Sequence, residues 1–219
     1  MAEQPTKAAT GKSARRWRCW GEVEDKLMRD YHDHEWGTPI HDDRKIFEFL
    51  VLEGMQAGLN WLMILRKREA FRRAFRNFDP AKVAKFKERD VARLLQDPGI
   101  VRNRLKIEAA ISNARRFLEV RKEFGSFDRY IWGFVGGRPV QSRLKSFKDM
   151  PARTPLSDRI STDLKARGFK FVGSTIVYSH LQATGMVNDH LVRCFRNREI
   201  VRAGKARARK RAAGAAAAA

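Results

Sequence analysis

Apolar residues recur along most of this chain at the spacing of an α-helix. The longest stripe runs from Ile107 to Leu118 and predicts one long helix. The same period predicts shorter helices over residues 46–50, 62–75, 83–86, 88–96, 156–166 and 175–184. No segment shows the clean alternation of apolar and polar residues, bounded by hairpin turns, that paired strands would show. The pattern therefore predicts an all-α fold.

Three of these stripes begin after a residue that suits a helix N-terminus. Asp42, Asn60 and Asp79 each precede a stripe, and their side-chain oxygens can accept from the free N–H groups of a first turn. Pro80 follows Asp79 at the position where a first-turn proline is favoured. These residues indicate where the helices begin.

Both ends of the chain lack this periodicity. Residues 1–16 are rich in Ala, Thr, Lys and Arg and are predicted to form a disordered basic arm. Residues 196–219 are predicted to be a basic, Ala-rich tail, which needs no packed structure but could become transiently helical or touch phosphates. Residues 17–195 between them are predicted to be the helical domain.

The charge of the chain is strongly positive. Lys and Arg number 46 against 25 acidic residues, a formal net charge of +21. The arm contributes +3 and residues 195–219 contribute +7, so the domain carries +11 of its own. A polyanion, nucleic acid above all, is the partner that this charge favours over an inert basic surface.

Membrane and secretory signals are missing from the sequence. No stretch approaches the roughly 18 uncharged apolar residues of a membrane span, and the N-terminal residues lack a signal peptide's apolar core. We therefore expect neither a membrane protein nor an ordinary secreted one.

Two cysteines and two histidines form a possible metal-ligand set. Zinc accepts a tetrahedral Cys₂His₂ set, which Cys19, His32, His190 and Cys194 can supply. Residues 190 and 194 would share one helix face. His34 competes with His32 for the ligand role. The residues alone leave open a disulfide, two buried thiols with hydrogen-bonded histidines, or a metal site that joins the two ends of the domain.

A carboxylate, Glu53, closes the apolar run 47–52. A carboxylate on an apolar face is costly unless it is paired or hydrogen-bonded. The Gly-bearing segment 54–60 and Trp61 follow at once, so this helix end could line a pocket for a flat polar ligand. A capped helix end with a solvated Glu53 is the equally simple alternative.

The segment 95–101 joins two predicted helices through a tight Pro98-Gly99 turn. Arg102, Arg104 and Lys106 follow directly. Such a helix–hairpin–helix directs backbone N–H groups outward at the start of its second helix, where phosphates bind. An ordinary corner between two helices with a basic surface is the alternative.

Aromatic residues are frequent in the first third of the chain. Trp17, Trp20, Tyr31, Trp36 and Trp61 could stack on a nucleobase, a contact that is worth about 1–3 kcal/mol per base in single-strand binders. Each of them could equally fill the core.

The order of these motifs resembles the DNA-3-methyladenine glycosylase I family across residues 17–195. The resemblance is carried by the motifs Arg18-Cys19-Trp20, Tyr31-His32-Asp33-His34-Glu35-Trp36-Gly37, Leu52-Glu53-Gly54-Met55-Gln56-Ala57-Gly58-Leu59-Asn60-Trp61, Arg167-Gly168-Phe169-Lys170-Phe171-Val172-Gly173 and Val187-Asn188-Asp189-His190. It implies a fold of the helix–hairpin–helix glycosylase superfamily and the excision of 3-methyladenine from alkylated double-stranded DNA.

The resemblance also implies roles for particular residues. The family's single zinc ion, which joins the two termini and is structural because four protein ligands leave no open position, would be held by Cys19, His32, His190 and Cys194. Glu53 matches the carboxylate that accepts hydrogen bonds from the adenine edge. The pocket aromatics are matched by Tyr31, Trp61 and Trp20. Contacts to DNA are assigned to Gly58, Leu59, Gly99, Arg102 and Lys106.

Two positions depart from the family pattern. Trp20-Gly21 stands in the opposite order from the relatives, and Met28 stands where a pocket tyrosine is common. These departures motivate one alternative, a glycosylase with a shifted range of alkylpurines. A zinc-stabilised DNA-binding protein without catalysis is the alternative from another class.

The resemblance implies a monofunctional reaction with base flipping. No motif marks Glu119, Glu123 or Asp128 as the catalytic acid that many superfamily members have after the hairpin, and no lysine stands out as a Schiff-base nucleophile. We expect no nucleotide cofactor and no membrane partner. The family-like default is a monomer in the bacterial cytoplasm.

Overall fold

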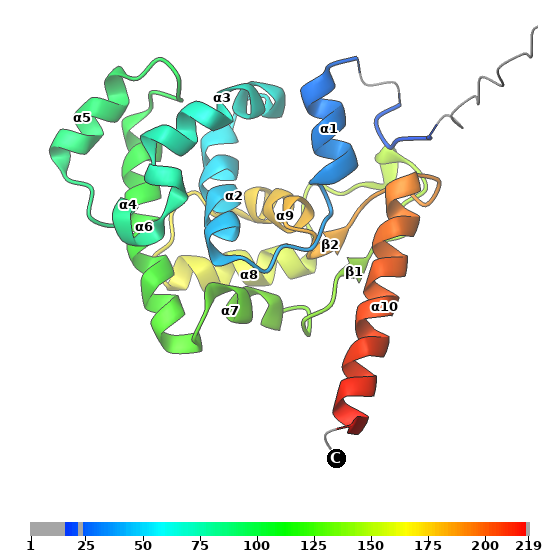
Figure 1. The fold of residues 1–219 in the computed structure, drawn as a ribbon. Coiled ribbons are helices and arrows are strands. Elements are labelled where there is room, and N and C mark those ends of the chain that lie inside the picture. Colours follow the sequence, from blue (N-terminus) through cyan, green and yellow to red (C-terminus); the bar gives the residue numbers. More distant parts are fainter. Residues whose placement is uncertain (1–15, 22–23, 218–219) are drawn as a thin grey trace, which may run out of the picture.

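The structure is a computed structural model that describes residues 16–21 and 24–217. Within these residues the chain forms ten α-helices, two 3₁₀ turns and one pair of two-residue strands. In chain order they are α1 (Lys26–His34), α2 (Asp43–Gln56), α3 (Trp61–Ala74), η1 (Arg76–Phe78), α4 (Pro80–Val83), α5 (Glu88–Gln96), α6 (Arg104–Phe124), α7 (Phe127–Gly133), β1 (Val140–Gln141), η2 (Phe147–Asp149), α8 (Pro155–Ala166), α9 (Ser174–Ala183), β2 (Val187–Asn188) and α10 (Phe195–Ala217). The all-α prediction is confirmed (Figure 1).

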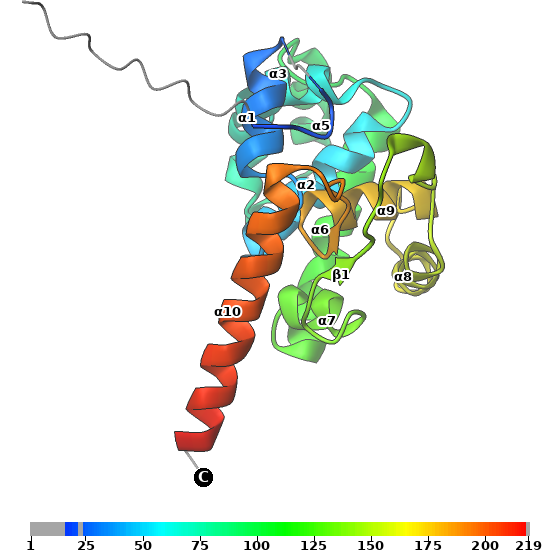
Figure 2. The same ribbon diagram turned by 90° about the vertical axis from the view of Figure 1, so that its right-hand side faces the viewer.

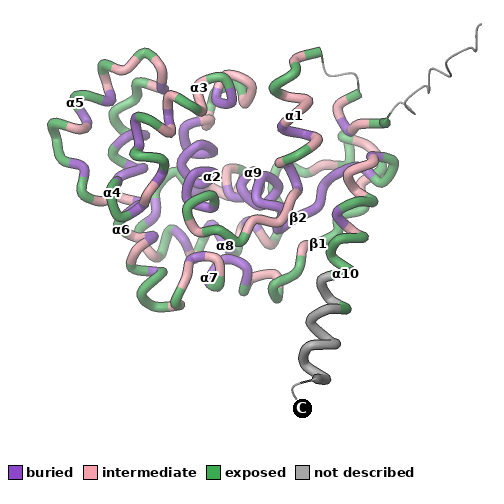
Figure 3. The backbone as a smooth tube through the Cα atoms, viewed as in Figure 1, coloured by how far each residue is buried: buried purple, intermediate pink, exposed green. Residues whose placement is uncertain are grey.

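Helix α2 is the central element of the core. Its residues 46–55 are all buried, so the helix is enclosed on every side rather than along one stripe (Figure 3). Helices α3, α6, α7 and α9 pack around it. Across α2, α6 and α7, the Phe47 ring packs edge-to-face against Phe117, and the Phe117 ring stacks on Phe127. This enclosure fixes the position of the functional residues at the C-terminal end of α2.

The predicted helix starts are confirmed. The Asp42 side chain accepts a hydrogen bond from the Lys45 N–H at the start of α2. Asn60 caps α3 and Asp79 caps α4 in the same way. Each cap satisfies N–H groups that have no partner within the helix.

Helices α5 and α6 meet at a tight turn over residues 97–103, where the sequence predicts the hairpin. The Asp97 carboxylate accepts from the Gly99 N–H at 2.8 Å and closes the turn. The Asn103 side chain accepts from the Lys106 N–H at 3.1 Å and caps α6. Helix α5 spans the residues predicted for it, and α6 extends the predicted stripe in both directions.

The tail prediction needs a correction. Residues 195–217 form the continuous helix α10, which extends away from the domain (Figures 1 and 2). Its first turns belong to the domain, because Ile200 is buried and the Asn197 amide donates to the His190 carbonyl at 2.7 Å. Ala, Arg and Lys favour a helix intrinsically, which a low-complexity interpretation leaves out of account. Of the predicted arm, residues 1–16, only Arg16 lies within the described residues.

The strand pair joins distant parts of the chain. β1 and β2 run parallel, and the Val140 N–H donates to the Met186 carbonyl at 2.9 Å. Two residues are too few for any alternation to show in the sequence. In the described part of the chain, no helix is long and apolar enough to cross a membrane.

Candidate base pocket and metal cluster

The four candidate metal ligands come together from both ends of the domain. His32 lies on α1, Cys19 precedes it, His190 follows β2 and Cys194 precedes α10. All four are buried, and their ligand atoms lie within 4.8 Å of one another. The Cys19 sulfur is 3.4 Å from His190 Nδ1, and the Cys194 sulfur is 3.5 Å from His32 Nε2. The two cysteines are free thiols, which excludes the disulfide alternative.

The outer ring nitrogens of the two histidines are already engaged. His32 Nδ1 lies 2.8 Å from an Asp33 carboxylate oxygen, and His190 Nε2 lies 2.9 Å from the Trp36 carbonyl. Both partners accept hydrogen bonds, so these nitrogens carry the protons. The lone pairs of the other two nitrogens therefore face the sulfurs, as in metal sites where a hydrogen bond from the outer ring nitrogen orients the histidine.

The spacing of the cluster fits a tetrahedral metal ion. Bonds of about 2.0–2.3 Å at tetrahedral angles place sulfur and nitrogen ligands ~3.6 Å apart, close to the separations found here. Hydrogen bonding from the Cys19 thiol lowers the pKa of Cys194, which favours the metal-binding thiolate. His34 is exposed and takes no part in the cluster. The cluster can therefore bind a metal.

Glu53 lies near the C-terminal end of α2 and is 4% exposed. Among the described residues its carboxylate has no hydrogen-bond or ion-pair partner. Burial raises the pKa of Glu53 to about 8, because a carboxylate without compensation resists ionisation in an apolar environment. Of the two alternatives that the sequence leaves open, the capped helix end with a solvated carboxylate is excluded.

The rings of Trp20, Tyr31 and Trp61 lie together. The Tyr31 and Trp61 ring centroids are 5.5 Å apart, and the Trp20 ring stacks on Tyr31 at 6.3 Å. Burial raises the pKa of Tyr31, and the Glu53 charge adds to this effect. The Trp61 indole N–H is buried without a partner in the described chain. An acceptor-bearing ligand could satisfy it.

Trp20 connects this pocket with the metal cluster. Its ring packs edge-on against His32 at 4.9 Å, and it also contacts the rings of Tyr31 and Trp36. Trp36 lies on the metal side, 4.6 Å from the His190 ring, and Met28 packs against the same buried group. A metal at the cluster would therefore fix the position of a pocket wall.

The loop between α2 and α3 carries Gly58 and Leu59 at the surface. Gly58 has a φ of +74°, which side chains with a Cβ rarely adopt. Leu59 is 38% exposed, and its carbonyl accepts from the Gln56 amide at 2.8 Å. An ordered loop thus presents an apolar side chain directly after the helix that carries Glu53.

The hairpin turn is held closely against α3. A Cβ on Gly99 would lie 2.7 Å from the Ala70 Cβ, so only glycine fits there. The Lys67 ammonium donates to the Pro98 carbonyl at 2.7 Å. Arg102 is exposed at the end of the turn, where a phosphate could reach it.

The position of the Lys106 side chain does not agree with its predicted role as a phosphate contact. It is only 9% exposed, and its ammonium donates to the carbonyls of Met55 at 2.8 Å and Ala57 at 2.7 Å. Burial lowers its pKa. These carbonyls are free acceptors at the C-terminal end of α2, where a cation also favours the helix dipole. Lys106 therefore ties the start of α6 to the helix end that carries Glu53.

Replacing Lys106 with methionine is expected to affect stability rather than DNA charge contacts. Two hydrogen bonds from a buried ammonium are lost, which lowers the free energy of unfolding by about 2–4 kcal/mol. The salt dependence of DNA binding should stay the same. As the matched variant, Arg102→Met should keep its stability and reduce the salt slope by about 1. Denaturant titrations and salt-dependent binding measure both, and the reverse pattern would restore Lys106 as a phosphate contact.

The acidic residues after the hairpin lie outside the pocket. Glu119 pairs with Arg116 and Glu123 pairs with Arg167, both at exposed positions. Asp128 forms a 2.8 Å contact with His41. Each of these carboxylates already has a surface partner, so none is placed beside Glu53.

A buried ion-pair network that the sequence analysis missed joins the helices around the pocket. The Arg68 guanidinium on α3 contacts Glu48 of α2 and Glu35, directly after α1, both at 2.6 Å. Arg68 also lies over the Phe49 ring at 5.1 Å. Glu48, like Glu53, is an acidic residue in an apolar run. This placement was the signal from which Glu48 could have been identified as an ion-pair partner.

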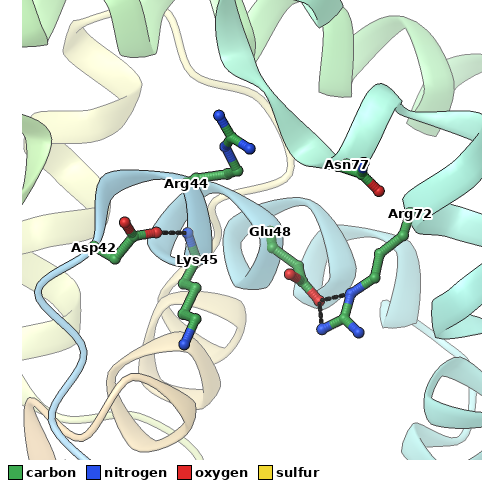
Figure 4. A pocket seen from close by; sticks show the side chains of 6 residues that line it. All are labelled: Asp42, Arg44, Lys45, Glu48, Arg72 and Asn77. Carbon is green, nitrogen blue, oxygen red and sulfur yellow. Dashed lines mark hydrogen bonds and ion pairs between the residues drawn. The ribbon is translucent and has the colours of Figure 1, made fainter.

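A surface recess of about 420 Å³ lies at the other end of α2 (Figure 4). Its lining alternates in charge, with Asp42, Arg44, Lys45 and the Glu48–Arg72 ion pair. The part of α2 that lines the recess ends at Glu48, five residues before Glu53, and none of the lining residues is Tyr31, Trp61 or Trp20. It is therefore separate from the aromatic pocket.

Comparison with known proteins shows which family has this sequence and fold. The family model for methyladenine glycosylases matches residues 20–197. DNA-3-methyladenine glycosylase 1 of Escherichia coli (strain K12) is 49% identical over 177 residues, which cover 81% of this chain and 95% of that protein. Residues 1–19 and 198–219 lie outside the family match.

Two solved structures share the fold. A crystal structure of 3-methyladenine DNA glycosylase I has a TM-score of 0.79 at 50% identity and covers 81% of this chain and 98% of its own. The enzyme from Staphylococcus aureus, solved to explain 3-methyladenine recognition, has a TM-score of 0.79 at 38% identity, with coverage of 82% and 95%. DNA glycosylases are thus the class whose fold this chain shares. The chain belongs to the methyladenine glycosylase family.

Proposed function

We propose that this chain is a DNA repair glycosylase that hydrolyses the N-glycosidic bond of 3-methyladenine in alkylated DNA. The observation that carries the proposal is a buried, unpaired carboxylate, Glu53, next to the Tyr31 and Trp61 rings in a member of this family. A protein that only binds DNA needs no such group, since burying it costs stability.

Recognition of the lesion follows from its charge. An adenine nucleotide alkylated at N3 is cationic, and a buried carboxylate among aromatic faces favours a cation over neutral adenine. Glu53 accepts hydrogen bonds from the polar edge of the base. Tyr31, Trp61 and Trp20 hold its faces. The pocket therefore selects the base that is already the better leaving group.

The base reaches this pocket by leaving the duplex. The turn with Gly99 and Arg102 holds phosphates, and Gly58-Leu59 enters the stack opposite the extruded nucleotide. Extrusion costs a few kcal/mol, and less for a damaged base, which adds to the selection. Met28 and Trp20 lie at the edge of this pocket and set how far other alkylpurines are accepted.

We expect the reaction to be monofunctional. Lys106, the one buried lysine among the described residues, is held by two carbonyls and is not free to attack the sugar. Borohydride added during turnover should therefore trap no covalent enzyme–DNA adduct. A lysine-dependent glycosylase run in parallel controls for trapping, and an adduct on this chain would overturn the monofunctional reaction.

Zinc is the metal proposed for the cluster. Two thiolates and two imidazoles are the donors that tetrahedral structural zinc sites use, and Cys19, His32, His190 and Cys194 would hold one ion. The ion would stabilise the fold and supply no chemistry to the reaction. By joining Cys19 to Cys194, these ligands hold Trp20 against Tyr31.

The cellular setting follows from the substrate. The named relatives are bacterial, and bacterial chromosomal DNA lies in the cytoplasm, where we place the enzyme. We propose that it acts as a monomer.

Complementation tests the proposed function in cells. A bacterial strain that lacks its 3-methyladenine glycosylases is killed by methylating agents, and this chain should restore its survival. Glu53→Gln should fail to restore it at the same protein level. Equal rescue by both proteins would remove Glu53 from the mechanism, and rescue by neither would favour the alternative of a silent DNA-binding protein.

A further inference from the structure

Helix α10 is an element that the family match does not include. The match ends at residue 197, whereas the helix continues to Ala217. Residues 198–219 contain seven basic residues and one acidic residue, Glu199, which pairs with Arg196 at 2.7 Å. The family match ends before this extension, so the family does not explain the role of the extension.

Four of its cations form one stripe. Arg198, Arg202, Lys205 and Arg209 are exposed and are spaced four, three and four residues apart, which places them on one helix face. None of them has an ion-pair partner in the described part of the chain. The stripe spans ~16 Å. These four unpaired cations form a line of positive charge that can bind along a polyanion.

The residue types of the helix favour duplex DNA. After Val201 the chain contains only Arg, Lys, Ala and Gly, so it has no bulky apolar side chain to insert into a lipid surface. It has no aromatic residue on which an unpaired base could stack. Contacts to the phosphate backbone, which need only cations, remain.

The direction of α10 separates it from the base pocket. The helix leaves the domain beside the metal cluster and runs away from the C-terminal end of α2, where Glu53 lies (Figures 1 and 2). The phosphates that it reaches are therefore different from those held near the flipped base. Ile200, buried against the domain, fixes this direction.

We propose that α10 is a second, sequence-independent DNA-binding element that holds a duplex segment other than the one that carries the lesion. Its contacts to phosphates keep the enzyme on DNA and allow it to bridge two segments. The inference goes beyond the proposed excision activity and does not depend on it.

Salt-dependent binding to undamaged duplex DNA tests the stripe. The triple variant Arg202→Gln, Lys205→Gln and Arg209→Gln should reduce the slope of log K against log salt by about 3, since each lost phosphate contact contributes close to 1. The control Arg202→Lys, Lys205→Arg and Arg209→Lys keeps the charge and should keep the slope. Gln, Lys and Arg have similar helix propensities, so both variants retain the helix.

A bridging experiment tests whether α10 binds a second duplex segment. Two duplexes with different fluorophores should be brought together by the full chain and not by a chain that ends at Val201, which retains Ile200. An unchanged slope in the glutamine variant, or equal bridging by the shortened chain, would overturn the proposal. If the glutamine variant lost binding to anionic vesicles or to duplex RNA but kept its binding to duplex DNA, the stripe would be assigned to another partner. That result would overturn the proposal as well.

The excision rate of the glutamine variant is measured separately from its DNA binding. The glutamine variant should cleave at the wild-type rate when the enzyme saturates a methylated duplex, because the pocket is unchanged. If the wild-type chain released no base, the proposed function would fail while the binding results would still decide the role of α10.

Discussion

Replacing Glu53 with glutamine is expected to reduce 3-methyladenine excision by ~100-fold or more while nonspecific DNA affinity remains. A hydrogen bond to a buried charged group is worth about 1.5–3 kcal/mol, and the cationic base loses its counter-charge as well. Phosphate contacts supply the nonspecific affinity and lie elsewhere. Single-turnover excision and binding to undamaged duplex measure the two quantities separately.

The control is Glu119→Gln, the same substitution at an exposed position on α6, where Glu119 pairs with Arg116. It should leave both excision and DNA affinity unchanged. Wild-type turnover by the Glu53 variant, or a comparable loss in the control, would remove Glu53 from the mechanism.

The raised pKa of Glu53 gives this substitution a pH signature. The ionised carboxylate is the form that attracts the cationic base, and kcat/KM reports the free enzyme. With a pKa of about 8, kcat/KM should rise with pH up to about 8 and then level off. The glutamine variant should lack this rise. A flat wild-type profile would show that the charge of Glu53 is not used.

The same shift makes Glu53 a cost to stability. Its pKa is higher in the folded chain than the ordinary 4.5, so the folded state binds the proton more tightly between pH 4.5 and about 8. The contribution of Glu53 to the free energy of unfolding is therefore fully present below pH 4.5. As the pH rises to 8, this contribution falls by an amount on the order of 4 kcal/mol. Glu53→Gln should stabilise the protein at pH 8 and have little effect at pH 4.5, which denaturant titrations can measure.

Replacing Cys194 with serine is expected to remove the metal and destabilise the fold together. The ligand set joins segments 175 residues apart, and loss of a structural metal belongs to the few changes that cost 4 kcal/mol or more. For a domain of this size that corresponds to a fall in Tm of ~10 °C. Metal content by elemental analysis and calorimetry on the same samples provide the two measurements.

His34→Ala is the matched control, since His34 lies two residues from the ligand His32 but is exposed. It should keep both the metal and the Tm. Chelation of the wild type should reproduce the loss seen in Cys194→Ser, and added zinc should reverse it. A metal-free wild type with unchanged Tm would contradict the proposed structural role.

The sequence predicted those helices whose apolar stripes and caps are local. Helix α5 begins and ends at the predicted residues, and Asn60 caps α3 as expected. Helix α1 was missed because most of its residues are polar and only Tyr31 and His32 are buried. The strands β1 and β2 were missed because they depend on a contact between distant segments.

The candidate site was predictable where residue type decides the chemistry. Cys19 belongs to a set of four residues that the fold brings together, and Glu53 is buried, while the roles proposed for them stay predictions. Lys106 was misassigned, because the direction of a long side chain depends on which carbonyls lie near it in the fold. The network of Arg68 and Glu48 was missed for the same reason, since three helices have to meet before the ion pairs exist.

The most direct test of the account is the identity of the bases that the purified protein releases from methylated duplex DNA. Chromatography should show mainly 3-methyladenine, released by the wild type and not by Glu53→Gln. A broader set of alkylpurines would point to the pocket edge at Met28 and Trp20. Tight DNA binding by folded, zinc-loaded protein without any released base would contradict the central claim.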